Sequence, residues 1–310
     1  MEVLRALEGL VASSRPVTLA LGMFDGVHLG HRAVLARTKE EAALAGSRAG
    51  ALTFDPHPQR VIAPPPDPIL LTTVDERLDL FAGLGMDLAV VLRFDQTLRE
   101  TPPEEWLSLL GEAARGGVVS SAHYTFGRDR AGTVDTLRAG AAQLGFGVTV
   151  VPPVHVASTL VSSTLIRRLV RRGEMEEAAR FLGRRYLVRG RVVEGEQRGR
   201  TLGFPTANLE VDSDKILPAK GIYAGWCRWE ADLVPAAISV GVRPTFGHGA
   251  LLVEAHLLDF AGDLYGQEIE LVFASRLRDE LAFRSVTDLV AQMARDVALV
   301  REVLAGSPLC

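Results

Sequence analysis

The sequence predicts an α/β domain, with a parallel sheet flanked by helices, followed by an antiparallel β-barrel with a terminal helix. Three observations support this fold class. The chain has 310 residues, a length that suits about two domains. Its first half alternates short apolar runs with helical patterns, as parallel sheets require. From residue 186 onward, short alternating segments are separated by Gly, Pro and Asp, which is typical of an antiparallel barrel or sandwich.

The elements of the first half follow one another in strand–helix order. The apolar runs that predict buried strands are residues 17–21, 50–54, 88–92, 117–119 and 148–151. The segments with helical spacing of apolar residues are 30–45, 73–84, 104–114 and 134–144. In an open parallel sheet, ligands bind beyond the carboxyl ends of the strands. We therefore look for chemistry at 22–31, at 55–58 and near Gly127.

A helix over residues 162–182, closed at 183–185, precedes the change of pattern. We therefore place the domain boundary between residues 184 and 185, giving domains 1–184 and 185–310. In the second domain the predicted strands are 186–193, 221–229, 235–240, 251–258 and 268–273. An amphipathic helix over 286–304 is expected to cover one opening of the barrel.

Composition and charge exclude several classes of protein. The chain is 47% hydrophobic, but its apolar runs fall far short of the ~20 residues of a transmembrane helix. A formal net charge of −4 supplies no positive field for a polyanion, so we expect neither a membrane nor a nucleic-acid partner. Residues 1–10 have helical spacing of charges and no secretory signal, which predicts a cytoplasmic location.

The two cysteines, Cys227 and Cys310, are too few for a disulfide framework or a cysteine-rich zinc site. No sustained heptad pattern indicates a coiled-coil oligomer, so the sequence leaves the oligomeric state open.

The segment 22–31, GMFDGVHLGH, predicts a phosphate site. It follows a buried strand and begins a helix, so its glycines and the positive end of the helix dipole favour an anion. His28 and His31 can donate hydrogen bonds to a triphosphate whose charge grows in the transition state. Two alternatives remain: a simple capping turn, and a zinc site that includes His57, although no H-E-x-x-H pattern accompanies these histidines.

The segment 198–209, RGRTLGFPTANL, is rich in glycine, positive charge and side-chain oxygens. Thr206 and Asn208 point to the same side of an extended chain, where their oxygens suit Mg²⁺. The alternative is a surface loop with an Asx turn. Further on, Glu254 and His256 share one face of a strand, and a carboxylate there can accept the proton of an alcohol that attacks a γ-phosphate. The alternative for Glu254 is a solvated surface carboxylate.

These segments resemble the motifs of one family, the prokaryotic bifunctional riboflavin kinases/FAD synthetases. Segment 22–31 is similar to its G-x-F-D-G-x-H-x-G-H motif, 53–58 to T-F-D-P-H-P, and 161–167 to I-S-S-T-x-I-R. Segment 198–209 is similar to its kinase signature, and 218–224, 239–246, 253–260, 263–266 and 277–283 resemble its later motifs. The resemblance covers about residues 17–304. It implies a Rossmann-like nucleotidyltransferase domain followed by a riboflavin kinase barrel.

The resemblance further implies that the barrel phosphorylates riboflavin to FMN and that the first domain joins FMN to AMP from ATP, releasing pyrophosphate. Small-molecule partners would be riboflavin, FMN and ATP, with Mg²⁺ as cofactor and FMN and FAD as product ligands. In the first domain it assigns catalysis to His28 and His31, and ATP binding to Gly22, Phe24, Asp25, His28, Gly30, His31, Ser163, Thr164 and Arg167. A helix N-cap is the alternative for 162–164.

Flavin binding in the first domain is assigned to Phe54, Pro56, His57, Pro58, His123 and Phe126. In the second domain the resemblance implies Gly203, Pro205, Thr206 and Asn208 for Mg²⁺–ATP, with Thr206 and Asn208 as metal ligands. Glu254 is the expected general base, and 263–266 and 277–283, with Arg278 and Phe283, are the expected flavin contacts.

Some positions depart from the motif pattern. His123 stands where Asn or Asp is usual, and Leu160 and Leu165 lie where an Arg is common. Met23 and Ser239 replace the usual Asn. These departures leave two alternative functions: a riboflavin kinase whose adenylyltransferase domain is weakened or lost, and a non-catalytic flavin- or nucleotide-binding sensor. The intact Thr206, Asn208 and Glu254 argue against the sensor.

Overall fold

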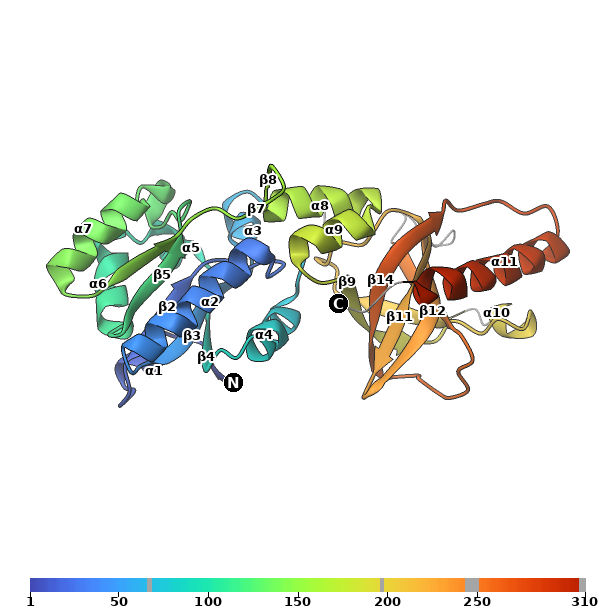
Figure 1. The fold of residues 1–310 in the computed structure, drawn as a ribbon, viewed down its shortest axis with the longest axis horizontal. Helices are drawn as coiled ribbons and strands as arrows, with labels where there is room; N and C mark the ends of the chain where they lie inside the picture. Colours follow the sequence, from blue (N-terminus) through green and yellow to red (C-terminus); the bar gives the residue numbers. More distant parts are fainter. Residues whose placement is uncertain (66–68, 196–197, 243–250, 307–310) are drawn as a thin grey trace. The chain divides into compact units, whose positions relative to one another are not determined.

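A computed structural model describes residues 1–65, 69–195, 198–242 and 251–306. The chain divides into two compact units, Met1–Ser163 and Thr164–Cys310, and Figure 1 shows the elements of each.

The first unit is built on a six-stranded sheet in the order β1-β4-β3-β2-β5-β6. Every pair of neighbouring strands runs parallel. The central strands are almost wholly buried because helices cover both faces of the sheet, which explains their continuous apolar runs. The strands are β1 Glu2–Leu4, β2 Val17–Leu21, β3 Arg48–Asp55, β4 Leu88–Arg93, β5 Gly117–Ser121 and β6 Val148–Val151.

The two faces of the sheet carry side chains of different size. On one face Leu19, Leu21 and Leu52 pack against α1, α6 and α7. On the other, Ala20 and Ala51 let α2 and α4 approach closely. The helices are α1 Glu8–Val11, α2 Leu29–Leu44, α3 Pro58–Ile62, α4 Val74–Gly83, α5 Gln96–Glu100, α6 Pro103–Ala113, η1 Arg128–Arg130 and α7 Val134–Leu144, with a hairpin of β7 His155–Val156 and β8 Thr159–Leu160.

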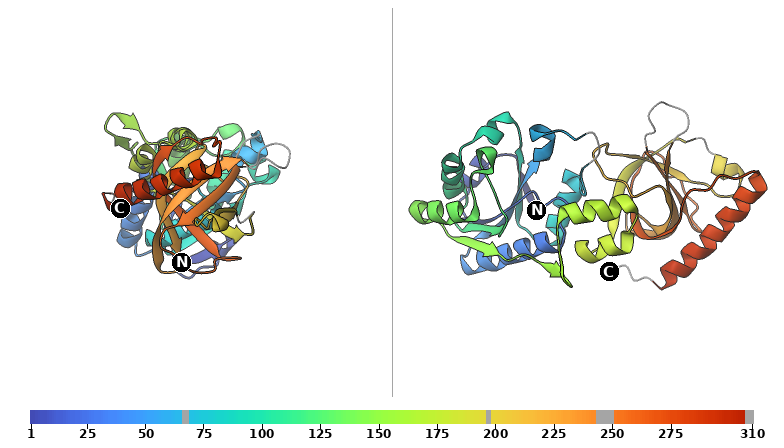
Figure 2. Two further views of the ribbon diagram at one scale, coloured as in Figure 1. Left: turned by 90° about the vertical axis from the view of Figure 1, so that its right-hand side faces the viewer. Right: turned by 90° about the horizontal axis from the view of Figure 1, so that it is seen from above.

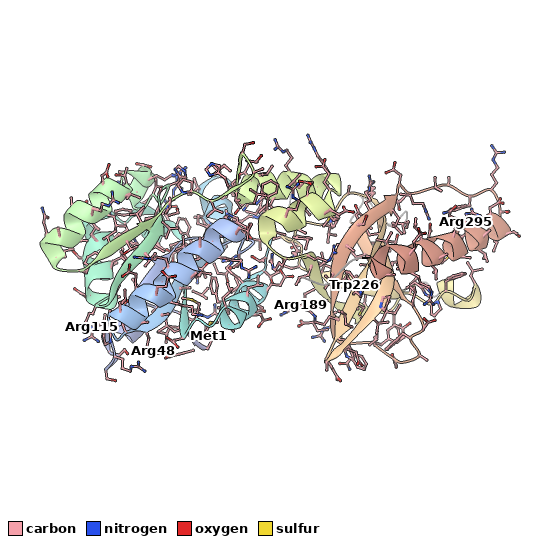
Figure 3. All side chains as sticks on the ribbon, viewed as in Figure 1. Met1, Arg48, Arg115, Arg189, Trp226 and Arg295 are labelled. Carbon is pink, nitrogen blue, oxygen red and sulfur yellow. The ribbon has the colours of Figure 1, made fainter. Side chains whose placement is uncertain are left out.

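The predicted α/β class and the five predicted strands are confirmed. Residues 1–10 carry charges at helical spacing, but Glu2–Leu4 forms the edge strand β1 beside β4 and only Glu8–Val11 of this segment begins a helix. Three residues are too few to show strand periodicity in the sequence. An ion pair between Arg48 and Glu2 joins β3 to β1, and Arg48 is labelled in Figure 3.

The second unit contains a closed antiparallel barrel in the order β10-β13-β12-β11-β14-β9. Its strands are β9 Tyr186–Val193, β10 Ala207–Val211, β11 Gly221–Trp229, β12 Asp232–Val242, β13 Leu251–Leu257 and β14 Glu268–Arg278. On the outside of the barrel, Arg189 pairs with Glu270 across β9 and β14 at 2.6 Å; Figure 3 labels Arg189. The helix α11 Val286–Ala305 packs against β11, β12 and β14 through buried Val300, and Figure 2 shows it beside the barrel.

The predicted barrel and terminal helix are confirmed, with three differences. The segment expected as a loop contains a short helix α10, Arg198–Thr201, and then the unpredicted strand β10. The helix expected over 162–182 is two helices, α8 Ser163–Arg172 and α9 Met175–Leu182, separated at Gly173 with φ +75°. The buried face of α9 packs against β9 and β14, so α9 groups with the barrel although the sequence-based boundary lies after it.

Two candidate active sites

The first candidate site begins at the loop between β2 and α2. His28 is the N-cap of α2, and its Nδ1 accepts a hydrogen bond from the His31 backbone N–H at 3.2 Å. Because Nδ1 is an acceptor there, Nε2 carries the hydrogen and is the donor nitrogen of a neutral His28. The His28 and His31 rings stack with their centroids 3.6 Å apart. The structure thus brings both predicted histidines together at the N-terminus of a 16-residue helix.

The same loop is held in an unusual backbone conformation. Phe24 has φ 53° and Val27 has φ 40°, in the left-handed region that favours glycine. Phe24 is buried and packs edge-on against Phe81 and His31. A Cβ at Gly30 would lie 3.2 Å from the His28 ring, so glycine there leaves room for the cap. This packing fixes the loop, as a preorganised anion site requires.

Asp25 fastens the loop to a distant segment. Its buried carboxylate accepts hydrogen bonds from the backbone N–H groups of Leu71 and Thr72 at 2.9 Å and from the Thr72 hydroxyl at 3.2 Å. Its carbonyl accepts one from the Ser163 hydroxyl at 2.9 Å. The Asp25 side chain therefore faces the 71–72 backbone and does not line the neighbouring cavity, so its expected ATP contact stays a prediction.

The second loop of this site follows β3. The Asp55–Pro56 peptide is cis, and His57 caps α3 by accepting the Gln59 backbone N–H on Nδ1 at 3.1 Å. Among the described residues, no group of three or more His, Cys, Asp or Glu side chains is placed to hold a metal. The structure therefore gives no support to the zinc alternative for His28, His31 and His57.

A cavity of about 740 Å³ lies at the carboxyl end of the sheet, between these loops and residues 121–130. Of the predicted site residues, the structure brings Gly22, Phe24, His31, Phe54, Pro58, His123 and Phe126 to its wall. It leaves Asp25, His28, Gly30, Pro56, His57 and Ser163 off the wall, and Thr164 and Arg167 belong to the second unit. The sequence analysis missed two aromatic residues of the wall, Phe94 and Trp106. Trp106 lies on the apolar face of α6, and a tryptophan in such a position is expected to belong to the hydrophobic core.

Sequence reasoning also missed Arg77, a wholly buried side chain on α4. It donates hydrogen bonds to the Thr53 hydroxyl at 2.6 Å, the Phe54 carbonyl at 3.3 Å and the Thr72 carbonyl at 3.4 Å. Thr53 donates in turn to the Met23 carbonyl at 2.7 Å. Burial lowers the pKa of Arg77, and the field of Asp25 partly offsets this effect. Its signal in the sequence was a charge on the apolar stripe of a helix.

The second candidate site lies in the barrel. Asn208 on β10 stands directly opposite Glu254 on β13, and Glu254 stands opposite Ser239 on β12. Directly opposed residues of antiparallel strands point to the same face, so these polar side chains converge. They line a cavity of about 450 Å³ together with Thr206, His256, Arg278 and Phe283. The structure thus unites most of the predicted kinase residues.

A neighbouring cavity of about 560 Å³ shares Thr206 and Asn208 with the first and is also lined by Pro205 and residues 260–265. The expected flavin contacts are therefore divided, because 263–265 line this cavity whereas Arg278 and Phe283 line the other. Gly203 lines neither cavity and has φ +83°. The predicted motif 239–246 lies outside the described residues from 243 onward.

His256 and Arg278 are both fixed by protein contacts. The Nδ1 of His256 lies 2.8 Å from the Pro205 carbonyl, and a carbonyl only accepts, so Nδ1 is the donor. Arg278 donates to both carboxylate oxygens of Asp296 on α11, at 2.9 and 2.6 Å. The Arg278 contact joins β14 to α11 at the barrel cavity, and the His256 contact joins β13 to Pro205, the residue before Thr206.

Comparisons with known proteins match both halves of the chain. A sequence model of FAD synthetases matches residues 11–165 and one of riboflavin kinases matches 182–304. The bifunctional riboflavin kinase/FMN adenylyltransferase of Listeria monocytogenes is 38% identical over 90% of this chain and 89% of its own. That of Pseudomonas fluorescens is 34% identical over 99% of each.

A solved structure from Streptococcus pneumoniae, described as a macrolide-efflux protein, is 28% identical with a TM-score of 0.87, over 96% of this chain and 98% of that one. In the present chain, none of the described helices has the length and apolarity needed to cross a bilayer. From the two sites, the two matched sequence models and the relatives of near-full length, we conclude that the chain belongs to the family of bifunctional riboflavin kinases/FMN adenylyltransferases.

Proposed function

We propose that the barrel transfers the γ-phosphoryl group of ATP to riboflavin, giving FMN and ADP, and that the α/β unit transfers AMP from ATP to FMN, giving FAD and pyrophosphate. The observation that carries this proposal is that each unit has its own cavity, walled by residues of its own motif. We assign residues 1–184 to the adenylyltransferase and 185–310 to the kinase. A chain that consumes ATP in both steps is expected to act in the cytoplasm.

In the kinase, the position of Glu254 supports an assignment of the two substrates to the two cavities. A general base must reach the attacking hydroxyl, so riboflavin occupies the cavity of about 450 Å³ that contains Glu254. The nucleotide then occupies the neighbouring cavity, and its γ-phosphate meets the alcohol near Thr206 and Asn208, which line both. Glu254 accepts the proton as the ribityl oxygen bonds to the γ-phosphorus and the bond to the ADP oxygen breaks.

The residues between the two cavities fit a magnesium ion. Thr206 and Asn208 supply a hydroxyl and an amide oxygen, which are hard donors of the kind that Mg²⁺ prefers. When bound there, Mg²⁺ would neutralise charge on the ATP phosphates. Asn208 is buried and fixed in β10, so this ligand would be oriented by the barrel itself.

In the adenylyltransferase, an oxygen of the FMN phosphate bonds to the α-phosphorus of ATP while the bond to pyrophosphate breaks. The N-terminus of α2 and the Nε2–H of His28 stabilise the negative charge that grows on the phosphates. His31 lies on the cavity wall and contacts the same phosphates. Phe54 and Phe126, together with Trp106, offer aromatic faces to the isoalloxazine ring. Ser163, Thr164 and Arg167 are the proposed further phosphate contacts.

A time course with riboflavin, ATP and Mg²⁺, followed by chromatography of the flavins, tests this function. We expect FMN to appear first and FAD to follow. FMN that accumulates without FAD would favour the alternative in which His123, Leu160 and Leu165 accompany a lost adenylyltransferase. Absence of both products would contradict the kinase assignment.

A further inference from the structure

Aromatic side chains gather on one part of the wall of the 740 Å³ cavity, and a hydrogen-bonded polar pair lies among them. The indole Nε1–H of Trp106, on α6, donates a hydrogen bond to the hydroxyl of Tyr124 at 3.2 Å. Both residues line the cavity, with the Phe126 ring stacked on Tyr124 at 5.7 Å and Phe54 beside Trp106 at 6.4 Å. The pair therefore belongs to the surface that an aromatic ligand would meet.

The chemistry of the two groups fixes the direction of this hydrogen bond. An indole N–H only donates, so the Tyr124 oxygen is the acceptor and its own proton points elsewhere. Within the described ranges, Trp106 is the hydrogen-bond partner of that oxygen. Burial raises the pKa of Tyr124, so the hydroxyl keeps its proton at physiological pH. Tyr124 thus offers a hydrogen-bond donor beside the aromatic rings of Phe54, Trp106 and Phe126.

We propose that the Tyr124 hydroxyl, oriented by Trp106, donates a hydrogen bond to an acceptor atom of the isoalloxazine ring of FMN, and so helps to select the flavin. The inference rests on the proposed adenylyltransferase function of this cavity. An isoalloxazine has an aromatic face for the surrounding rings and carbonyl oxygens and ring nitrogens for a donor. A site with a buried donor binds a ligand that can accept its hydrogen bond better than one that cannot.

The test uses the full chain and the variant Tyr124→Phe, which removes only the hydroxyl. We expect the KM for FMN in FAD formation to rise about three- to tenfold, while kcat and the KM for ATP change by less than about twofold. Tyr186→Phe is the matched control, because it removes a hydroxyl that donates to the Ile216 carbonyl inside the barrel. The control is expected to leave the KM for FMN unchanged.

The orientation by Trp106 has its own readout. Trp106→Phe leaves the Tyr124 hydroxyl in place but without the indole donor, so we expect a smaller rise in KM for FMN than in Tyr124→Phe. Phenylalanine at position 106 keeps an aromatic face for the flavin and loses only the indole donor, so in the double variant the rise should equal that of Tyr124→Phe alone. Fully additive effects in the double variant would overturn the orienting role.

Calorimetric titration with FMN separates this inference from the proposed function. Two flavin cavities predict two classes of FMN site, and Tyr124→Phe should weaken one of them and leave the barrel site as an internal control. If the wild-type chain makes no FAD but Tyr124→Phe still weakens one class, the function is wrong and the Tyr124 contact stands. If Tyr124→Phe changes only thermal stability and neither the FMN affinities nor KM, the inference is overturned.

Discussion

The buried guanidinium of Arg77 is expected to control the stability of the first unit. It links the carboxyl end of β3, at Thr53 and Phe54, to the Thr72 carbonyl, and through Thr53 it supports Met23 in the histidine loop. Arg77→Met keeps much of the side-chain volume but removes the charge and every one of these donors. Leaving one buried acceptor without its donor costs about 1–3 kcal/mol, so we expect about 3–5 kcal/mol for these three acceptors together.

The cost translates into a temperature shift. For a unit of this size each kcal/mol lowers the unfolding midpoint by about 2–4 °C, so the expected decrease is roughly 6–20 °C. FAD formation from FMN reports whether the first unit is folded, and FMN formation from riboflavin reports whether the barrel is folded. After heating, FAD formation from FMN should be lost at this lower temperature, while FMN formation from riboflavin is lost at nearly the wild-type temperature.

A matched control and a conservative variant sharpen the test. Arg37→Met removes an exposed arginine of the same unit that pairs with Glu40 and Glu41 on the surface of α2, so its effect should stay below about 1 kcal/mol. Arg77→Lys keeps the charge but cannot present the guanidinium fork, and should fall between wild type and Arg77→Met. The reasoning is refuted if Arg77→Met inactivates FAD formation within about 2 °C of the control.

Three further predictions concern the barrel. His256→Asn places an amide donor where Nδ1 lies, so the steady-state rate of the kinase should stay within about threefold of wild type. His256→Gln and His256→Ala lack a donor at that position and should lose about tenfold in the same rate. Equal loss in all three variants would contradict the donor role of His256. In a Cys310→Ser background, buried Cys227, whose pKa burial raises to about 11, should resist a thiol reagent at pH 8 until the chain is unfolded. Burial also raises the pKa of Tyr223 to about 12. Because Tyr223 and Cys227 lose their protons more easily in the unfolded chain, the free energy of unfolding of the barrel should be constant below about pH 9 and decrease as the pH rises toward 12. Denaturant unfolding of the barrel at several pH values will check this dependence.

The fold class and the positions of both sites followed from local patterns in the sequence. Buried parallel strands appear as apolar runs, and a glycine-rich segment between a strand and a helix is typical of an anion site. His28 and His31 could therefore be predicted to lie where a helix begins after a buried strand, and the structure has them there. Glu254 and Asn208 could be related only through the family resemblance, because they lie far apart in the sequence. The register of β10 against β13 then shows that they stand directly opposite one another.

Other features depend on contacts between distant segments and left no local pattern. The contacts of the Asp25 carboxylate with the backbone N–H groups of Leu71 and Thr72 could not be predicted, because those residues lie more than forty positions away in the sequence. The break at Gly173 was missed because the apolar spacing continues on both sides of it. Arg77 shows the same limit, since its three hydrogen-bond partners lie 5 to 24 residues away in the chain.

The central claim, that one chain holds two separate active sites, is tested most directly by exchanging substrates between two variants. Glu254→Gln should form no FMN from riboflavin but should still convert added FMN to FAD. His28→Ala should convert riboflavin to FMN and stop there. Chromatography of the flavins from both variants, each given riboflavin or FMN with ATP and Mg²⁺, therefore predicts opposite patterns. Loss of both activities in either variant would contradict the account.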